Sequence, residues 1–156
     1  MKIYTLKRKQ ILPKPLKELF AFFARPENLQ QITPPELGFQ IITPSPIVME
    51  KGSLIDYQIR LSGFPFRWRT LITNYNPPHE FVDEQIKGPY SYWHHRHQFY
   101  TEGDTTVIED TVTYTIPFGI LGRILHTLFI RKKLRKIFEY RKDIIEKLFE
   151  ERQDKK

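Results

Sequence analysis

The feature that most constrains the fold is a succession of short strand-like segments, followed by one long helical segment. Apolar and polar residues alternate within the short segments, and turns rich in Pro, Gly, Asn or Ser separate them. Separators this short leave no room for crossover connections, so the pattern predicts antiparallel strands. We expect seven strands, at residues 2–10, 39–43, 54–61, 66–74, 80–86, 90–101 and 105–116.

Helical spacing of apolar residues marks the rest of the chain. Residues 15–24 and 25–32 predict two short helices after the first strand, and a final helix of some thirty residues follows Gly119. The apolar residues of this final helix form two sets about half a turn apart, so one straight helix cannot bury both. The two sets are Leu121, Ile124, Leu125 and Leu128, and Leu134, Ile137, Phe138, Ile145 and Leu148. We therefore predict a kink near residues 129–132, or exposure of the first set.

Length and composition favour one globular domain that covers residues 1–156. The chain has 156 residues, of which 40% are hydrophobic and 14% aromatic, which argues against a disordered chain. It contains no cysteine, which excludes disulfides, thiol catalysis and Cys-based metal sites. Because the N-terminus has no apolar stretch typical of a signal peptide, we expect a cytoplasmic protein.

The net charge of +7 is concentrated at one end of the chain. From Arg123 onward there are 12 Lys or Arg against 6 Asp or Glu, whereas the rest of the chain has 13 against 12. This distribution argues against nucleic acid as a partner, because the body lacks a basic surface. The dense basic segment 131–136 follows an apolar stretch, which leaves two alternatives open: a solvated helix face, which we favour, or transient contact with a membrane surface.

Several motifs along the chain resemble the ligand-binding branch of the START-like (SRPBCC) superfamily. This superfamily includes polyketide cyclases/dehydrases, plant hormone and allergen binders of the Bet v 1-like type, lipid carriers and coenzyme Q-binding proteins. The motifs are TPPELGF at 33–39, WRTLI at 68–72, PPHEFVDEQ at 77–85, GPY at 88–90, WHHRHQF at 93–99 and DTVTYTIPFG at 110–119.

The resemblance covers nearly the whole chain and implies an α+β helix-grip fold. In this fold a curved antiparallel sheet of about seven strands wraps a long C-terminal helix and leaves a cavity between them. The implied function is binding of a small hydrophobic ligand, such as a lipid, an isoprenoid quinone or a polyketide-like aromatic, by a carrier or binding module. The alternatives are an acid–base enzyme of the cyclase/dehydratase type, or a non-enzymatic regulatory domain. We expect no bound cofactor.

Strand periodicity places a polar group among the aromatic residues on one wall of the sheet. Asp83, His95, His97 and Asp110 are expected to share this face, because alternate residues of a strand point the same way. Three interpretations stay open: acid–base catalysis by His–Asp pairs, a zinc site, and a satisfied polar network that holds the fold or a ligand head group. The four residues are the catalytic candidates, and we favour the third interpretation and expect no metal ion.

A further set of mostly apolar residues is expected to contact the ligand. Binding cavities are largely apolar with a few placed polar groups, which suits the aromatic content of this chain. Arg69 is expected to form an ordinary salt bridge with Asp83 or Glu84 across strands. The predicted ligand contacts are Trp68, Phe81, Gln85, Trp93, Phe99, Tyr114, Leu121 and Leu125.

Overall fold

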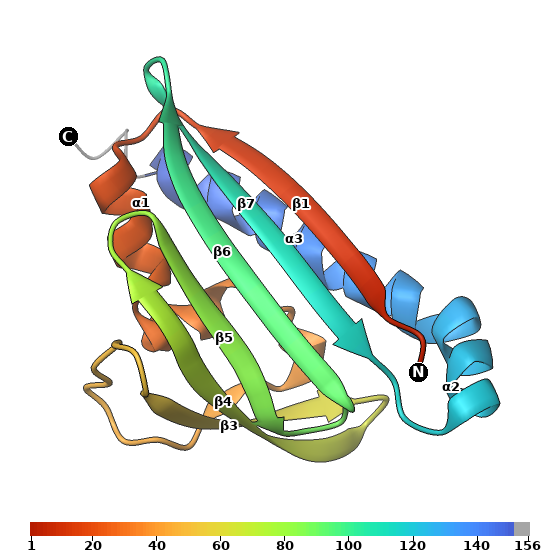
Figure 1. The fold of residues 1–156 in the computed structure, drawn as a ribbon. Coiled ribbons are helices and arrows are strands. Elements are labelled where there is room, and N and C mark those ends of the chain that lie inside the picture. Colours follow the sequence, from red (N-terminus) through yellow and green to blue (C-terminus); the bar gives the residue numbers. More distant parts are fainter. Residues whose placement is uncertain (152–156) are drawn as a thin grey trace.

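The computed structural model describes residues 1–151, which form one sheet with helices on one of its sides (Figure 1). The strands are β1 (Tyr4–Leu12), β2 (Gln40–Ile41), β3 (Leu54–Leu61), β4 (Phe64–Asn76), β5 (Glu80–Lys87), β6 (Tyr92–Glu102) and β7 (Thr105–Thr115). The helical segments are α1 (Leu16–Phe23), the 3-10 turns η1 (Pro26–Ile32) and η2 (Pro35–Leu37), α2 (Gly119–Leu125), the π-helical turn η3 (His126–Ile130) and α3 (Arg131–Glu151).

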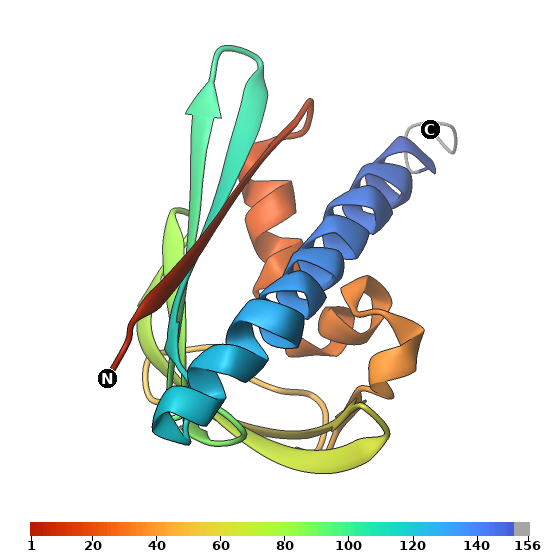
Figure 2. The same cartoon turned by 90° about the vertical axis from the view of Figure 1, so that its right-hand side faces the viewer.

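All seven strands belong to one antiparallel sheet in the order β1-β7-β6-β5-β4-β3-β2. Strands β2 to β7 are a meander, and β1 closes the far edge by pairing with β7. Figure 2 shows the sheet from its edge, with α1, the 3-10 turns and α3 on the same side. The predicted helix-grip architecture is therefore confirmed. No helix within residues 1–151 is long and apolar enough to span a membrane.

Most predicted elements agree with the observed ones within a few residues, although η2 was not expected and two other elements differ. Strand β2 has only two residues instead of five, because the backbone N–H groups of Ile42 and Thr43 both donate to the carbonyl oxygen of Asp56. This shared acceptor ends the regular ladder in the manner of a bulge. The second short helix is a 3-10 turn and not an α-helix, and it begins at Pro26.

The C-terminal helix changes its winding at the π-helical turn η3. The inward-facing residues recur every fourth position through Gly122, His126, Ile130 and Leu134, of which Ile130 is partly buried. In a regular α-helix with 3.6 residues per turn, residues spaced four apart move gradually round the helix axis. The π turn contains more residues per turn, so it brings these residues back to the same face. The first apolar set consequently points outward, with Leu121 and Leu128 both 59% exposed. The predicted exposure of the first set is confirmed, and the helix changes its winding at residues 126–130 without ending there.

The turn into α2 is held by close packing. A Cβ atom at Gly122 would clash with the carbonyl oxygen of Pro117, so only glycine fits there. Further along, the Nε2 atom of His126 lies 2.8 Å from the hydroxyl of Tyr114 on β7, and Tyr4 of β1 stacks on the imidazole ring with the centroids 3.6 Å apart. These contacts fasten the start of the C-terminal helix to the β1–β7 edge of the sheet.

Candidate functional site

A cavity of about 170 Å³ lies between the sheet, α3 and the segment that contains α1 and η1. Its wall is mostly aromatic and aliphatic. Tyr57 of β3 and Trp68 of β4 stack at 5.7 Å, and Trp68 meets Trp93 of β6 edge-on at 5.3 Å. Tyr90 completes this aromatic wall, 4.8 Å from Trp93. Rings that brace one another in this way give the cavity a fixed shape at that end.

The histidine and aspartate side chains of the wall come from β5 and β6, and Arg141 comes from α3. Asp83, His95, His97 and Arg141 all line the cavity. The register of the sheet pairs Asp83 with His95 across β5 and β6, and pairs His97 with Asp110 across β6 and β7. Each histidine therefore lies beside a carboxylate from a neighbouring strand, as the alternation in the sequence predicts.

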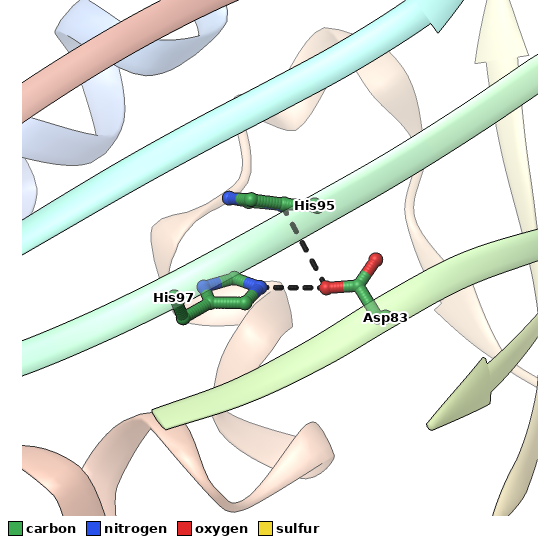
Figure 3. Close-up of side chains that lie close together, drawn as sticks. All are labelled: Asp83, His95 and His97. Atoms are coloured by element: carbon green, nitrogen blue, oxygen red, sulfur yellow. Dashed lines mark hydrogen bonds and ion pairs between the residues drawn. The ribbon is translucent and has the colours of Figure 1, made fainter. Parts of the chain in front are cut away.

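Each of the two carboxylates faces both histidine rings. The Oδ2 atom of Asp83 lies 2.6 Å from Nε2 of His97 and 3.7 Å from Nδ1 of His95 (Figure 3). On the other side, Oδ1 of Asp110 lies 2.8 Å from Nε2 of His95 and 3.1 Å from Nδ1 of His97. All four ring nitrogens thus point toward carboxylate oxygens. We call these four residues the His–Asp cluster.

The protonation of the His–Asp cluster follows from burial and from these contacts. Burial alone would raise the pKa of Asp110 and of Asp83, but the hydrogen bonds and charges of the two histidines outweigh it and hold both pKa values below their usual range. Burial lowers the pKa of His95, helped by the charge on His97. For His97 the hydrogen bonds to Asp110 and Asp83 outweigh burial and raise the pKa. These shifts favour the charged form of His97, which lies between two carboxylates, and the neutral form of His95.

Six of the predicted site residues line the cavity: Trp68, Phe81, Asp83, Trp93, His95 and His97. Asp110 does not. It borders a smaller adjoining pocket and reaches the site only through its contacts with the two rings.

Three other predicted contacts lie away from the cavity because their side chains are engaged elsewhere. Gln85 closes the turn before β6, where its amide donates to the carbonyl oxygen of Tyr90 and accepts from the Tyr90 N–H. Phe99 packs in the apolar core against Phe20, with the centroids 5.2 Å apart. Tyr114 is occupied by its contact with His126.

The structure also corrects two expectations about exposed side chains. Leu121 and Leu125 lie on the outer face of α2, 59% and 38% exposed, and form no part of the cavity wall. They were expected in the cavity because the spacing of apolar residues does not reveal the π turn η3, which changes the direction in which the residues of α2 point. Arg69 pairs with Asp56 on β3, at 2.8 Å, and not with Asp83 or Glu84, because its side chain points away from the cavity.

Sequence reasoning missed Tyr57, Tyr90 and Arg141. Arg141 projects from α3 with its guanidinium carbon 5.0 Å from the ring centroid of Phe138, and its Nε atom is buried without a hydrogen-bond partner among the described residues. The indole Nε1 atom of Trp68 is also buried without one. Arg141 lies three and seven residues beyond Phe138 and Leu134, so its place on the apolar face was the signal that could have found it.

The cluster also has the composition of a metal site. One donor atom each from Asp83, His95 and His97 can be chosen so that all three lie within 4.8 Å of one another. Imidazole nitrogens with a carboxylate oxygen are a donor set that transition metals accept.

Comparison with solved structures finds the same fold in proteins of very different sequence. A START superfamily protein from Mycobacterium smegmatis is 11% identical, covers 92% of this chain and 98% of its own, and has a TM-score of 0.68. Major latex-like protein 151 from Panax ginseng is 10% identical, with 92% and 95% covered and a TM-score of 0.67. Norcoclaurine synthase from Thalictrum flavum is 14% identical, with 92% and 87% covered and a TM-score of 0.63.

A search of curated proteins found no match to this chain. The family model described as polyketide cyclase / dehydrase and lipid transport matches residues 12–138, which is most of the chain. The matched region runs from the end of β1 into α3 and includes the whole His–Asp cluster and all of the cavity wall except Arg141. The chain therefore belongs to the polyketide cyclase / dehydrase and lipid transport family.

Proposed function

We propose that the protein binds one small, largely apolar molecule in the cavity beneath α3 and acts as a carrier or binding module. The observation that carries the proposal is the cavity of about 170 Å³, with its wall of braced aromatic rings and its few polar groups. An apolar cavity of about 150 Å³ is large enough to hold a single benzene ring. The space therefore suits a ring system or the end of an isoprenoid or acyl chain.

The polar groups give the ligand a preferred orientation. Asp83, His97 and Arg141 form one wall, and the aromatic pair Tyr57 and Trp68 lies beside them. Two buried donors in this wall, Nε1 of Trp68 and Nε of Arg141, have no partner among residues 1–151. Because an unpaired buried donor is costly, a ligand with a carbonyl or carboxylate oxygen gains most if a small side-chain movement brings that oxygen to one of these donors. A quinone and a polyketide-like aromatic both have such an oxygen.

Ligand binding is tested by comparing two tryptophan substitutions. Ile59 lines the cavity, and Ile59→Trp fills part of it, whereas Ile86→Trp adds the same bulk at a residue that is 55% exposed on β5. We expect menadione and oleic acid, added separately, to raise the melting temperature of the wild type and of the Ile86 variant, but not of the Ile59 variant. Native mass spectrometry of the purified wild type should show a copurified apolar molecule.

The proposal would be refuted by a wild type that copurifies with nothing and that neither probe stabilises. Equal stabilisation of all three proteins would also refute it, because binding would then occur outside the cavity. Circular dichroism on the Ile59 variant checks that the protein is folded before the comparison is made.

A second candidate function is acid–base chemistry on a bound carbonyl compound. It is favoured by a specific observation: His95 and His97 line the cavity, and each contacts a carboxylate. A ring held in this way can remove a proton next to a carbonyl group and return it. The test is exchange of the α-protons of α-tetralone in D₂O, followed by NMR. We expect acceleration by the wild type and none by His95→Gln, because His95 is the ring that stays neutral and can accept a proton, and a wild type that causes no acceleration refutes this candidate.

Membrane contact belongs to the same proposal, since a carrier must collect an apolar ligand. Seven large apolar side chains of residues 118–129 are 38% to 75% exposed, far more than a solvated helix face requires: Phe118, Ile120, Leu121, Ile124, Leu125, Leu128 and Phe129. Basic residues Arg131 and Lys132 follow directly and are exposed. An apolar surface beside positive charge matches an anionic lipid surface.

Vesicle flotation tests the membrane contact. We expect the wild type to float with vesicles that contain 30% phosphatidylserine, and the double variant Lys132→Glu/Lys133→Glu to float much less. The double variant Lys7→Glu/Lys9→Glu makes the same change of charge on β1 and should float like the wild type. If the two variants behave alike, the contact is not made by this helix.

A further inference from the structure

We propose that Asp83, His95 and His97 form a binding site for a divalent transition-metal ion of the Zn²⁺ class, with a coordination position open to the cavity. This proposal does not depend on the identity of the apolar ligand. It rests on how the ring nitrogens are divided between the two carboxylates, on the spacing of the donors, and on the packing that fixes the two rings.

The four ring nitrogens fall into two groups. Nδ1 of His95 and Nε2 of His97 face Oδ2 of Asp83, so these three atoms form one triangle of donors (Figure 3). The other two nitrogens face Oδ1 of Asp110 at 2.8 and 3.1 Å. A histidine that binds a metal usually donates its second N–H to a carboxylate, which fixes the tautomer and the direction of the ring. Here Asp110 is placed to accept from both rings at once.

The triangle has nearly the size that a metal ion needs. Tetrahedral sites with metal–ligand bonds of about 2.0–2.2 Å place the ligand atoms roughly 3.3–3.5 Å apart. Two of the separations here are 2.6 Å and 3.7 Å, and the three residues offer donor atoms within 4.8 Å of one another. The carboxylate of Asp83 has only to move slightly away from His97 to admit an ion between them.

The two rings are held in place by the surrounding side chains. His95 and His97 are 5% and 7% exposed and occupy alternate positions of the central strand β6. Phe81 stacks on His97 with the centroids 4.1 Å apart, and Phe138 of α3 packs edge-on against His95 at 5.7 Å. A site on a strand with its rings fixed by packing loses little conformational freedom when it binds an ion.

The open position follows from which residues reach the cavity. Asp83, His95 and His97 line it, whereas Asp110 lies behind the rings. Three protein donors with a free fourth position are typical of catalytic zinc sites, whereas structural zinc sites have four protein ligands. The imidazole donors favour Zn²⁺, Fe²⁺ or Co²⁺ over Mg²⁺ and Ca²⁺, which prefer oxygen. A water molecule or a carbonyl oxygen of the cavity ligand would complete the coordination.

Calorimetry with Zn²⁺ on chelator-treated protein tests the site. We expect one ion per chain, and a rise in melting temperature of roughly 5–10 °C at a Zn²⁺ concentration 100-fold above Kd. Co²⁺ should give the intense visible absorption of a four-coordinate ion. Asp110→Asn should weaken Zn²⁺ binding about 10- to 100-fold, the usual effect of losing a carboxylate that orients a ligand. His97→Gln should abolish binding.

The matched control is His94→Gln. This substitution also removes an imidazole ring from β6, but His94 does not line the cavity. It should bind Zn²⁺ like the wild type. The proposal is overturned if the wild type binds no Zn²⁺, if His97→Gln binds it unchanged, or if His94→Gln loses it. Should His97→Gln fail to fold, the Co²⁺ spectrum of the wild type decides, and a weak octahedral spectrum refutes the site. Menadione binding by metal-free protein separates this outcome from failure of the proposed function.

Discussion

Replacing Asp110 by asparagine tests whether the His–Asp cluster stabilises the fold. The substitution keeps the shape and the acceptor oxygen of the side chain but removes its negative charge. Oδ1 of Asp110 contacts Nε2 of His95 and Nδ1 of His97, at 2.8 and 3.1 Å. Both contacts therefore change from bonds with a charged acceptor to bonds with a neutral one.

The expected loss is about 2–3 kcal/mol. A hydrogen bond to a charged group contributes roughly 1.5–3 kcal/mol and a neutral one roughly 0.5–1.5 kcal/mol, so two bonds lose about 2 kcal/mol together. The charged ring of His97 also loses one of its two carboxylates, which adds to the cost. Complete removal of one partner of a buried ion pair costs about 3–5 kcal/mol and sets the upper limit.

Urea unfolding of metal-free protein, followed by circular dichroism, measures this free energy. For a chain of this size a loss of 2–3 kcal/mol lowers the melting temperature by roughly 5–10 °C. The control is Glu109→Gln on the adjacent position of β7, where the side chain accepts an exposed hydrogen bond from Tyr100. It should change the stability by less than about 0.5 kcal/mol. An Asp110→Asn protein as stable as this control would refute the argument.

Two further predictions concern the C-terminal helix and the loop beside the cavity. Phe138→Ala should cost about 3–5 kcal/mol in urea unfolding and Phe129→Ala almost nothing, because the two rings are 4% and 63% exposed; equal costs would contradict the phase assigned to the helix. Hydrogen bonds from the Ile47 N–H and the Ser45 hydroxyl lower the pKa of Glu27. Their stabilisation is therefore complete above the unfolded-state pKa near 4.3 and disappears as the pH falls through the lowered value. Protection of the Ile47 amide from hydrogen exchange, corrected for the intrinsic rate, should follow this course, and protection that is unchanged down to pH 2 would contradict it.

The strands and the His–Asp cluster could be predicted because both depend on local periodicity. Alternation in β6 places His95 and His97 on one face, and the short turns make its neighbours antiparallel, so Asp83 and Asp110 follow from the same pattern. The pattern does not say which nitrogen faces which carboxylate. That depends on the register between strands and on side-chain rotamers, which the spacing of residues leaves open.

Contacts between distant elements could not be predicted. The partner of Arg69 depends on which face of the sheet its side chain occupies and on the register of β3 against β4, which places Asp56 opposite Arg69. The spacing of Arg141 from Phe138 places it on the inner face of α3, but how far it reaches into the cavity wall depends on how the helix packs on the sheet. Leu121 and Leu125 were misplaced because the π turn rotates every residue before it relative to those after it.

The π-helical turn at His126–Ile130 also bears on how such a protein diverges. Before the turn, the outward side chains of α2 touch neither the cavity nor the cluster. After it, Leu134 and Phe138 pack over the cavity. Substitutions among the outward side chains of α2 therefore leave the cavity wall unchanged. One continuous helix thus contains an exposed apolar surface and a cavity-facing surface that can vary independently of each other.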